Sequence, residues 1–146
     1  MVILSKFAEN LSALMQEHNL NAPALGEKLD THRTNLTRYL QGKRLPNYHL
    51  FIKIVEYFNV SADVLLGRLD YCDVETFLPV EPFGTTLRRA LDETHTSQYN
   101  LQQNLHYSSA TTTSWLANES IPSMEHICQL ADYLDVTVDF LLGRIK

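Results

Sequence analysis

The sequence repeats itself once, and this repeat is the strongest constraint on how the chain can fold. Residues 7–70 match residues 83–146 at an offset of 76, with 15 identities in 64 positions and no insertion or deletion. The match is densest at its end, where Asp63-Val-Leu-Leu-Gly-Arg68 corresponds to Asp139-Phe-Leu-Leu-Gly-Arg144. A repeat of this length indicates two copies of one structural unit.

The repeat predicts two domains and a short connection between them. We expect the first domain at residues 1–70 and the second at residues 83–146, each long enough to fold around a modest core of its own. Residues 71–82 contain two prolines and interrupt the helical pattern, so they are interpreted as a linker. The apolar residues of this linker indicate that it packs against something.

Hydrophobic spacing within each copy predicts an all-α unit of five short helices. Phe7, Leu11 and Met15 belong to an apolar stripe with the helical period, and no stretch has the two-residue period of a strand. The remaining helices are located by residues that favour helix ends. In the first copy these are Asn21 before the second helix, Gly42 after a third helix at 33–40, Asn47 before the fourth and Ser61 before the fifth.

Composition excludes several classes of protein. The two cysteines lie far apart and in no metal-binding spacing, so we expect reduced thiols and a cytoplasmic setting. We find no phosphate-binding loop, paired metal motif or nucleophile elbow in the sequence, and no apolar run long enough to span a membrane. We therefore expect no enzymatic activity, no cofactor, no metal and no small-molecule ligand.

The region of the second and third helices has the pattern of a helix-turn-helix, with Asp30-Thr31-His32 as the turn. Residues 25–29, 33–46 and 60–67 resemble the Xre, Cro and phage-repressor family, with Gly42-Lys-Arg-Leu-Pro46 among the more specific segments. The resemblance covers nearly the whole chain, once per copy. It implies two consecutive lambda-repressor-like domains of five helices and a transcription regulator that binds double-stranded DNA. It also makes a homodimer compatible with the chain.

The third helix of the first copy is the expected base-contacting element. Leu36 and Leu40 are spaced to face the core, which leaves the opposite side of the helix for DNA. The family's pattern implies contacts with base edges from Arg33, Thr34, Thr37 and Arg38.

Phosphate contacts are expected from residues on either side of that helix. The candidates are Asn21, Gln41, Lys43 and Arg44. Five basic residues lie between Lys28 and Arg44, although the net charge of the whole chain is −5. This charge argues against a protein that coats nucleic acid through bulk electrostatics but allows a local basic surface. Alternatively, Arg33 pairs with Asp30, and the basic residues after the helix form only a solvated turn.

The second copy has a different surface at the same positions. Where the first copy has Arg33, Arg38 and Lys43, the second has Ser109, Ser114 and Glu119. Residues 76–146 contain four basic and eight acidic residues. Possible DNA contacts in this copy are Ser97, Gln98, Ser109, Ala110 and Ser114.

Three arrangements are compatible with this contrast. Both copies bind DNA as a covalent pseudo-dimer, or only the first binds DNA while the second mediates self-association or partner binding. In the third arrangement the protein has lost DNA binding and serves as an interaction module. We favour the second arrangement.

Overall fold

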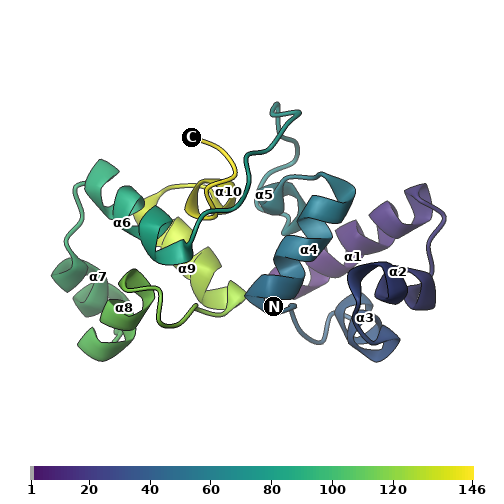
Figure 1. Ribbon diagram of the computed structural model, residues 1–146, viewed down its shortest axis with the longest axis horizontal. Helices are drawn as coiled ribbons and strands as arrows, with labels where there is room; N and C mark the ends of the chain where they lie inside the picture. The colour runs from purple at the N-terminus through teal and green to yellow at the C-terminus, as the bar shows by residue number, and fades with distance from the viewer. Residues whose placement is uncertain (1) are drawn as a thin grey trace. The chain divides into compact units, whose positions relative to one another are not determined.

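The computed structural model describes residues 2–146, which form ten α-helices and no β-strand within that range (Figure 1). The described chain divides into two compact units, one ending at Thr76 and the other beginning at Phe77. The all-α class predicted from the hydrophobic spacing is confirmed. Among the described residues, none of the helices is both long and apolar enough to cross a membrane.

The first unit packs five helices around an apolar core. Phe7 and Leu11 from the first helix, Leu25 from the second and Phe51 from the fourth are completely buried. The helices are α1 (Val2–Glu17), α2 (Ala22–Leu29), α3 (Arg33–Leu40), α4 (Tyr48–Phe58) and α5 (Ala62–Leu65).

The second unit also contains five helices, and four of them have the same bounds as their counterparts at an offset of 76 residues. Its helices are α6 (Phe83–Glu93), α7 (Gln98–Leu105), α8 (Ser109–Leu116), α9 (Met124–Leu134) and α10 (Val138–Leu141). The exception is α6, which begins at the position equivalent to Phe7, whereas α1 begins five residues earlier. Pro79 and Pro82 explain this difference, because proline inside a helix removes a backbone donor and clashes with the preceding turn.

Side-chain caps begin most of these helices, as the sequence predicts. Asn21 Oδ1 accepts from the backbone N–H of Ala24 at 2.9 Å, and Asn47 Oδ1 accepts from that of Leu50 at the same distance. Ser61 caps α5 in the same way. Each cap satisfies a donor that the helix itself cannot pair, so it fixes where the helix starts.

The closing Asp-x-Leu-Leu-Gly-Arg block forms an internal ion pair in both units. Arg68 Nε lies 3.0 Å from Asp63 Oδ1, and Arg144 Nη1 lies 2.7 Å from Asp139 Oδ1. No role for either arginine is apparent from the sequence alone. In the structure, each arginine binds the aspartate in the first turn of the preceding short helix. The ion pair therefore links the last residues of each unit to that helix.

A second polar contact recurs at equivalent positions. Asn10 Nδ2 donates to the backbone oxygens of Val64 and Leu65, at 3.0 Å each. In the second unit the Thr86 hydroxyl donates to the backbone oxygen of Leu141. Both contacts join the first helix of the unit to its last one.

The predicted linker is divided between the two units. Up to Thr76 it belongs with the first unit, where Asn59 Nδ2 donates to the backbone oxygen of Glu75 at 3.3 Å. From Phe77 it packs on the second unit, where the N–H of Leu78 donates to the backbone oxygen of Arg144 at 2.8 Å.

The final part of this segment is held by a bidentate ion pair. Arg89 donates from Nη1 and Nη2 to the two carboxylate oxygens of Glu81, at 2.7 and 2.9 Å. These hydrogen bonds are the main reason that the pKa of the Glu81 carboxyl lies below its usual value. The expectation that the linker packs is confirmed for this part. Cys72 and Cys128 are both present as thiols and not as a disulfide.

Candidate nucleic-acid interface

Helices α2 and α3 of the first unit are joined by a tight turn at Asp30-Thr31-His32. Asp30 ends α2 in the left-handed conformation, with φ of 54°, and the N–H of Thr31 donates to the backbone oxygen of Gly26 at 2.9 Å. A Cβ atom on Gly26 would lie 2.8 Å from the backbone oxygen of Thr31, which is too close for an unperturbed contact. The missing side chain therefore permits the close approach of this turn to α2.

His32 determines where α3 begins. Its Nδ1 accepts a hydrogen bond from the N–H of Thr34 at 3.1 Å, so the imidazole serves as the N-cap. The sequence indicated only a turn residue here, because histidine is not among the preferred capping residues.

The outer face of α3 displays all four predicted base-contacting residues. Leu36 is completely buried and Tyr39 is almost so, which fixes the inner face of the helix. Leu40, one residue further along the same side, is half-buried, so Leu36 and Tyr39 are the most deeply buried residues of the helix. The four residues with exposed side chains are Arg33, Thr34, Thr37 and Arg38.

These side chains differ in how strongly they are held. The Thr37 hydroxyl donates to the backbone oxygen of Arg33 at 3.1 Å, so its proton is already used. Within the described part of the chain, no salt bridge joins Arg33 to Asp30, and none involves Arg38. Both guanidinium groups therefore keep their donors for an external partner.

The basic residues after α3 lie in two different environments. Lys43 is exposed, and no salt bridge holds it among the described residues. Arg44 is also exposed, but its Nη2 donates to Asn35 Oδ1 at 3.0 Å and its Cζ lies 5.6 Å from the ring centroid of Tyr39. The segment after α3 therefore has one lysine free of ion pairs and one anchored arginine.

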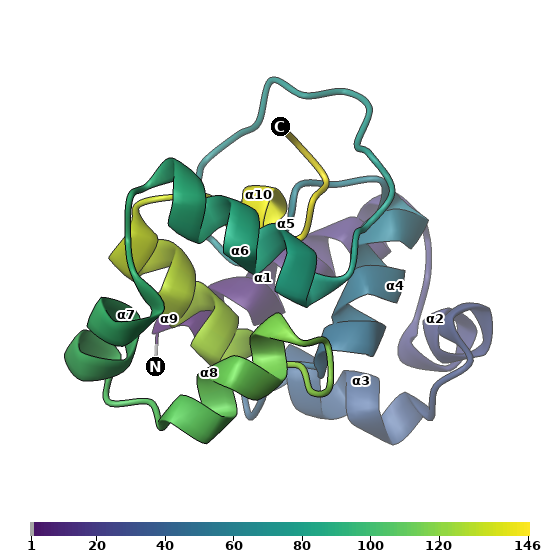
Figure 2. The same ribbon diagram turned by 60° about the vertical axis from the view of Figure 1, so that its left-hand side comes forward.

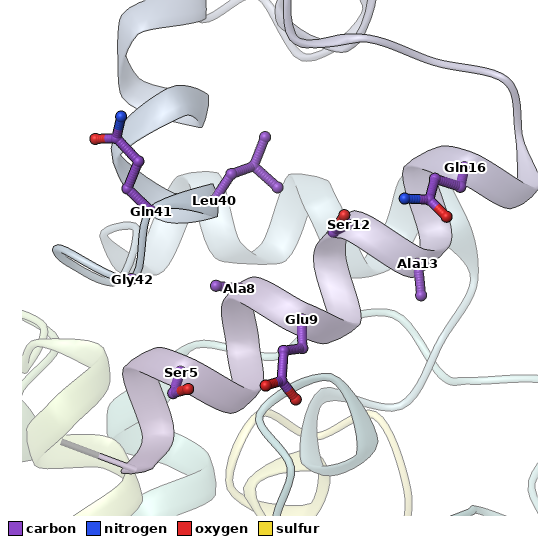
Figure 3. A pocket seen from close by; sticks show the side chains of 9 residues that line it. All are labelled: Ser5, Ala8, Glu9, Ser12, Ala13, Gln16, Leu40, Gln41 and Gly42. Atoms are coloured by element: carbon purple, nitrogen blue, oxygen red, sulfur yellow. The ribbon is translucent and has the colours of Figure 1, made fainter.

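Gln41 lies at the edge of a hollow of about 670 Å³ between α1 and the end of α3. Small side chains of α1, including Ala8 and Ser12, form the opposite wall (Figure 3). The side chain of Gln41 extends away from α1 in this view, and it is exposed. It is therefore accessible to a partner that approaches the end of α3.

The amino terminus of α2 offers fewer anion-binding donors than expected. Pro23 has no N–H, and the N–H of Ala24 is taken by the side chain of Asn21. A phosphate contact from Asn21 would therefore use its own side-chain amide more than the N–H groups of the helix.

In the second unit, α7 and α8 lie next to each other (Figure 2) and are joined by polar side chains. Gln98 Nε2 donates to Thr112 Oγ1 at 3.1 Å and to Thr113 Oγ1 at 3.0 Å. Gln102, at the position equivalent to Gly26, also donates to Thr112 Oγ1, at 2.6 Å. Thr112 is completely buried where the first unit has Leu36. The side-chain amide of Gln98 is therefore occupied within its own unit.

The other predicted contacts of the second unit are divided between exposed and internally bonded groups. Ser109 and Ala110 are exposed. Ser114 is half-buried, and its hydroxyl lies 2.7 Å from that of Ser120. Ser97 caps α7 by accepting from the N–H of Asn100 at 3.0 Å. This face has no basic side chain to offer an anion.

Two residues of the first unit that the sequence did not indicate support this surface. His32 starts α3, and Asn35 holds Arg44 across the end of the same helix. Asn35 and Arg44 are nine residues apart and separated by a helix end, so no helical period connects them. Only the three-dimensional arrangement identifies this pair.

A family model described as Helix-turn-helix matches residues 11–65, which include α2 to α5 and the later part of α1. The match confirms the helix-turn-helix resemblance of the first unit and ends before the second unit begins. Comparison with the curated proteins found no match, and comparison with the solved structures found none either.

Proposed function

We propose that the chain is a sequence-specific DNA-binding transcription regulator whose first unit inserts α3 into the major groove. The observation that supports this most directly is the exposed face of α3, where Arg33, Thr34, Thr37 and Arg38 lie together opposite a buried apolar face. The helix-turn-helix match over the same region supports the proposal independently.

The two arginines of α3 suit guanine in particular. A guanidinium group can donate to O6 and N7 of one guanine at the same time, and such a contact contributes about 1–3 kcal/mol of discrimination against another base. Since no ion pair within the described part of the chain uses Arg33 or Arg38, neither contact requires an internal salt bridge to break. Thr34 and Thr37 would complete the contacted stretch.

Phosphate contacts come from the residues that flank the helix. Lys43 and Arg44 follow α3 directly, and Gln41 is exposed beside them. These contacts position the helix on the duplex but do not discriminate between sequences. Asn21 would contribute from the start of α2.

For the second unit we propose that the same scaffold serves a function other than DNA binding. It lacks the basic residues of α3, and its Gln98 side chain is bonded to α8. Self-association or the binding of another protein fits a surface without these basic residues better than DNA binding does. A homodimer formed in this way would present two first units to two half-sites.

Binding-site selection with the intact chain tests the proposal. We expect a defined motif to be enriched by the unmodified protein and by Ser114→Glu, and to be lost when Arg33 and Arg38 are both replaced by alanine. A motif altered by Ser114→Glu would instead support DNA contacts from both units. If no sequence is enriched, the chain acts as an interaction module and the proposal is wrong.

A further inference from the structure

We infer that Asn35 is a positioning residue that holds Arg44 ready for a DNA phosphate. The inference rests on the proposed function and concerns one contact within it. Asn35 lies on α3 and is half-buried, whereas Arg44 is exposed in the segment after the helix. The hydrogen bond from Arg44 Nη2 to Asn35 Oδ1, at 3.0 Å, joins the two.

The orientation of the Asn35 amide is itself fixed. Its Nδ2 donates to Thr31 Oγ1 at 3.2 Å, in the turn between α2 and α3. With the nitrogen committed to Thr31, the oxygen faces Arg44. A chain of contacts therefore runs from the turn before α3, across the helix, to the segment after it.

Tyr39 restrains the same guanidinium from another side. The Arg44 Cζ lies 5.6 Å from the centre of the Tyr39 ring, within the range of a cation–π contact. Tyr39 is 2 % exposed, so its ring is a fixed platform. Two independent contacts thus reduce the conformational freedom of Arg44.

These contacts leave Arg44 able to bind an anion. A guanidinium group has five N–H donors, and Asn35 takes one of them. Since Asn35 is neutral, the positive charge of Arg44 is not cancelled. Ordering a long side chain before binding reduces the entropy lost when a phosphate is bound.

The second unit lacks the two polar members of this arrangement and keeps an aromatic ring at the third position. The positions equivalent to Asn35, Tyr39 and Arg44 have Thr111, Trp115 and Ser120. Thr111 accepts from the hydroxyl of Ser108 at 2.8 Å, and Ser120 pairs with Ser114. The clamp, defined as Asn35, Tyr39 and Arg44, is therefore specific to the unit that has the basic surface.

A double-mutant cycle on the intact chain tests this role. The proteins are the unmodified chain, Asn35→Ala, Arg44→Ala and the double variant, titrated with a labelled duplex recovered by binding-site selection and with a duplex of random sequence. We expect Asn35→Ala to weaken binding about three- to tenfold on both duplexes. In the Arg44→Ala background the loss of Asn35 should have no further effect.

Lys43→Ala is the matched control, since it removes a neighbouring cation that Asn35 does not touch. Each lysine or arginine that loses its phosphate should reduce the slope of log K against log salt concentration by about 0.9. Because Asn35 does not touch Lys43, the losses of DNA affinity caused by Asn35→Ala and by Lys43→Ala should be independent of each other. Asn35→Thr, which introduces the residue of the second unit, provides a second variant compatible with the scaffold.

An effect of Asn35→Ala that persists without Arg44 would overturn the inference, because Asn35 would then act on DNA or on the helix by itself. Unchanged affinity in Asn35→Ala would also overturn it. Failure of the unmodified chain to bind either duplex would refute the proposed function and this inference together. The mobility of the Arg44 Nε–H group in NMR provides a readout without DNA, and it should increase in Asn35→Ala.

Discussion

Asp139 and Arg144 form an ion pair inside the second unit, with 2.7 Å between Oδ1 and Nη1, and both side chains are at most 2 % exposed. The corresponding pair of the first unit, Asp63 and Arg68, has the same separation in sequence, but its arginine is 16 % exposed. Both units thus contain the same ion pair, but the arginine of the pair is more exposed in the first unit than in the second.

Removing one partner of the buried pair should destabilise the second unit strongly. Asp139→Asn preserves the size of the side chain but removes the negative charge that Arg144 faces, and breaking a buried ion pair in this way costs about 3–5 kcal/mol. Asp63→Asn should cost clearly less, because water reaches Arg68. Urea unfolding of the intact variants measures both losses, and equal losses would contradict the difference in burial.

Gly26→Ala should destabilise the first unit although alanine favours helices. The new Cβ would meet the backbone oxygen of Thr31 at 2.8 Å, and overpacking of this kind costs about 1–3 kcal/mol. Glu27→Ala, on the exposed side of the same helix, should change the free energy of unfolding by no more than about 0.5 kcal/mol. Thermal unfolding compares the two, and a stabilised Gly26→Ala variant would show that Gly26 is not in close contact with the turn after α2.

Arg38→Ala and Lys43→Ala should weaken DNA binding in different ways. Arg38→Ala should cost about 1–3 kcal/mol on the selected duplex and relax the preference at one position. Lys43→Ala should weaken the selected and random duplexes alike, since a phosphate contact is independent of sequence. Anisotropy titrations with both duplexes separate these effects. Uniform weakening by Arg38→Ala would remove it from the base-contacting set.

The Glu81–Arg89 pair predicts a local pH dependence. Because the hydrogen bonds from Arg89 lower the pKa of Glu81, the pair stabilises the folded state above the ordinary glutamate pKa of about 4.3. This contribution is lost as the pH falls through the lowered pKa of the folded state. NMR titration of the Glu81 carboxyl should show its pKa rise in Arg89→Ala and stay unchanged in the control Arg88→Ala. The same pKa in Arg89→Ala as in the unmodified chain would argue against the ion pair.

Much of the fold could be predicted because its signals are local. Asn21, Asn47 and Ser61 mark helix starts through their own side chains, and Gly42 adopts the left-handed conformation, with φ of 71°, that ends α3. Such features depend on neighbours within four residues. The starts of α2, α4 and α5 therefore follow from the sequence, whereas the start of α3 depends on His32, which the sequence did not indicate as a cap.

The candidate surface was predictable in position but not in detail. Helical spacing placed Arg33 and Arg38 on the outer face, whereas the anchoring of Arg44 depends on a contact across a helix end. The second unit has the buried Thr112 where the first has Leu36. The hydroxyl of Thr112 accepts hydrogen bonds from Gln98 and Gln102, and helical spacing does not predict these contacts. Polar networks depend on side-chain geometry, which a periodic pattern does not encode.

The salt dependence of DNA binding by the intact chain tests the central claim most directly. With the selected duplex, log K should fall linearly with log salt concentration. The slope should become shallower in Lys43→Ala and stay the same in Arg88→Ala, which removes an exposed arginine of the second unit. Affinity independent of salt, or a slope reduced by Arg88→Ala and not by Lys43→Ala, would contradict a DNA-binding surface on the first unit.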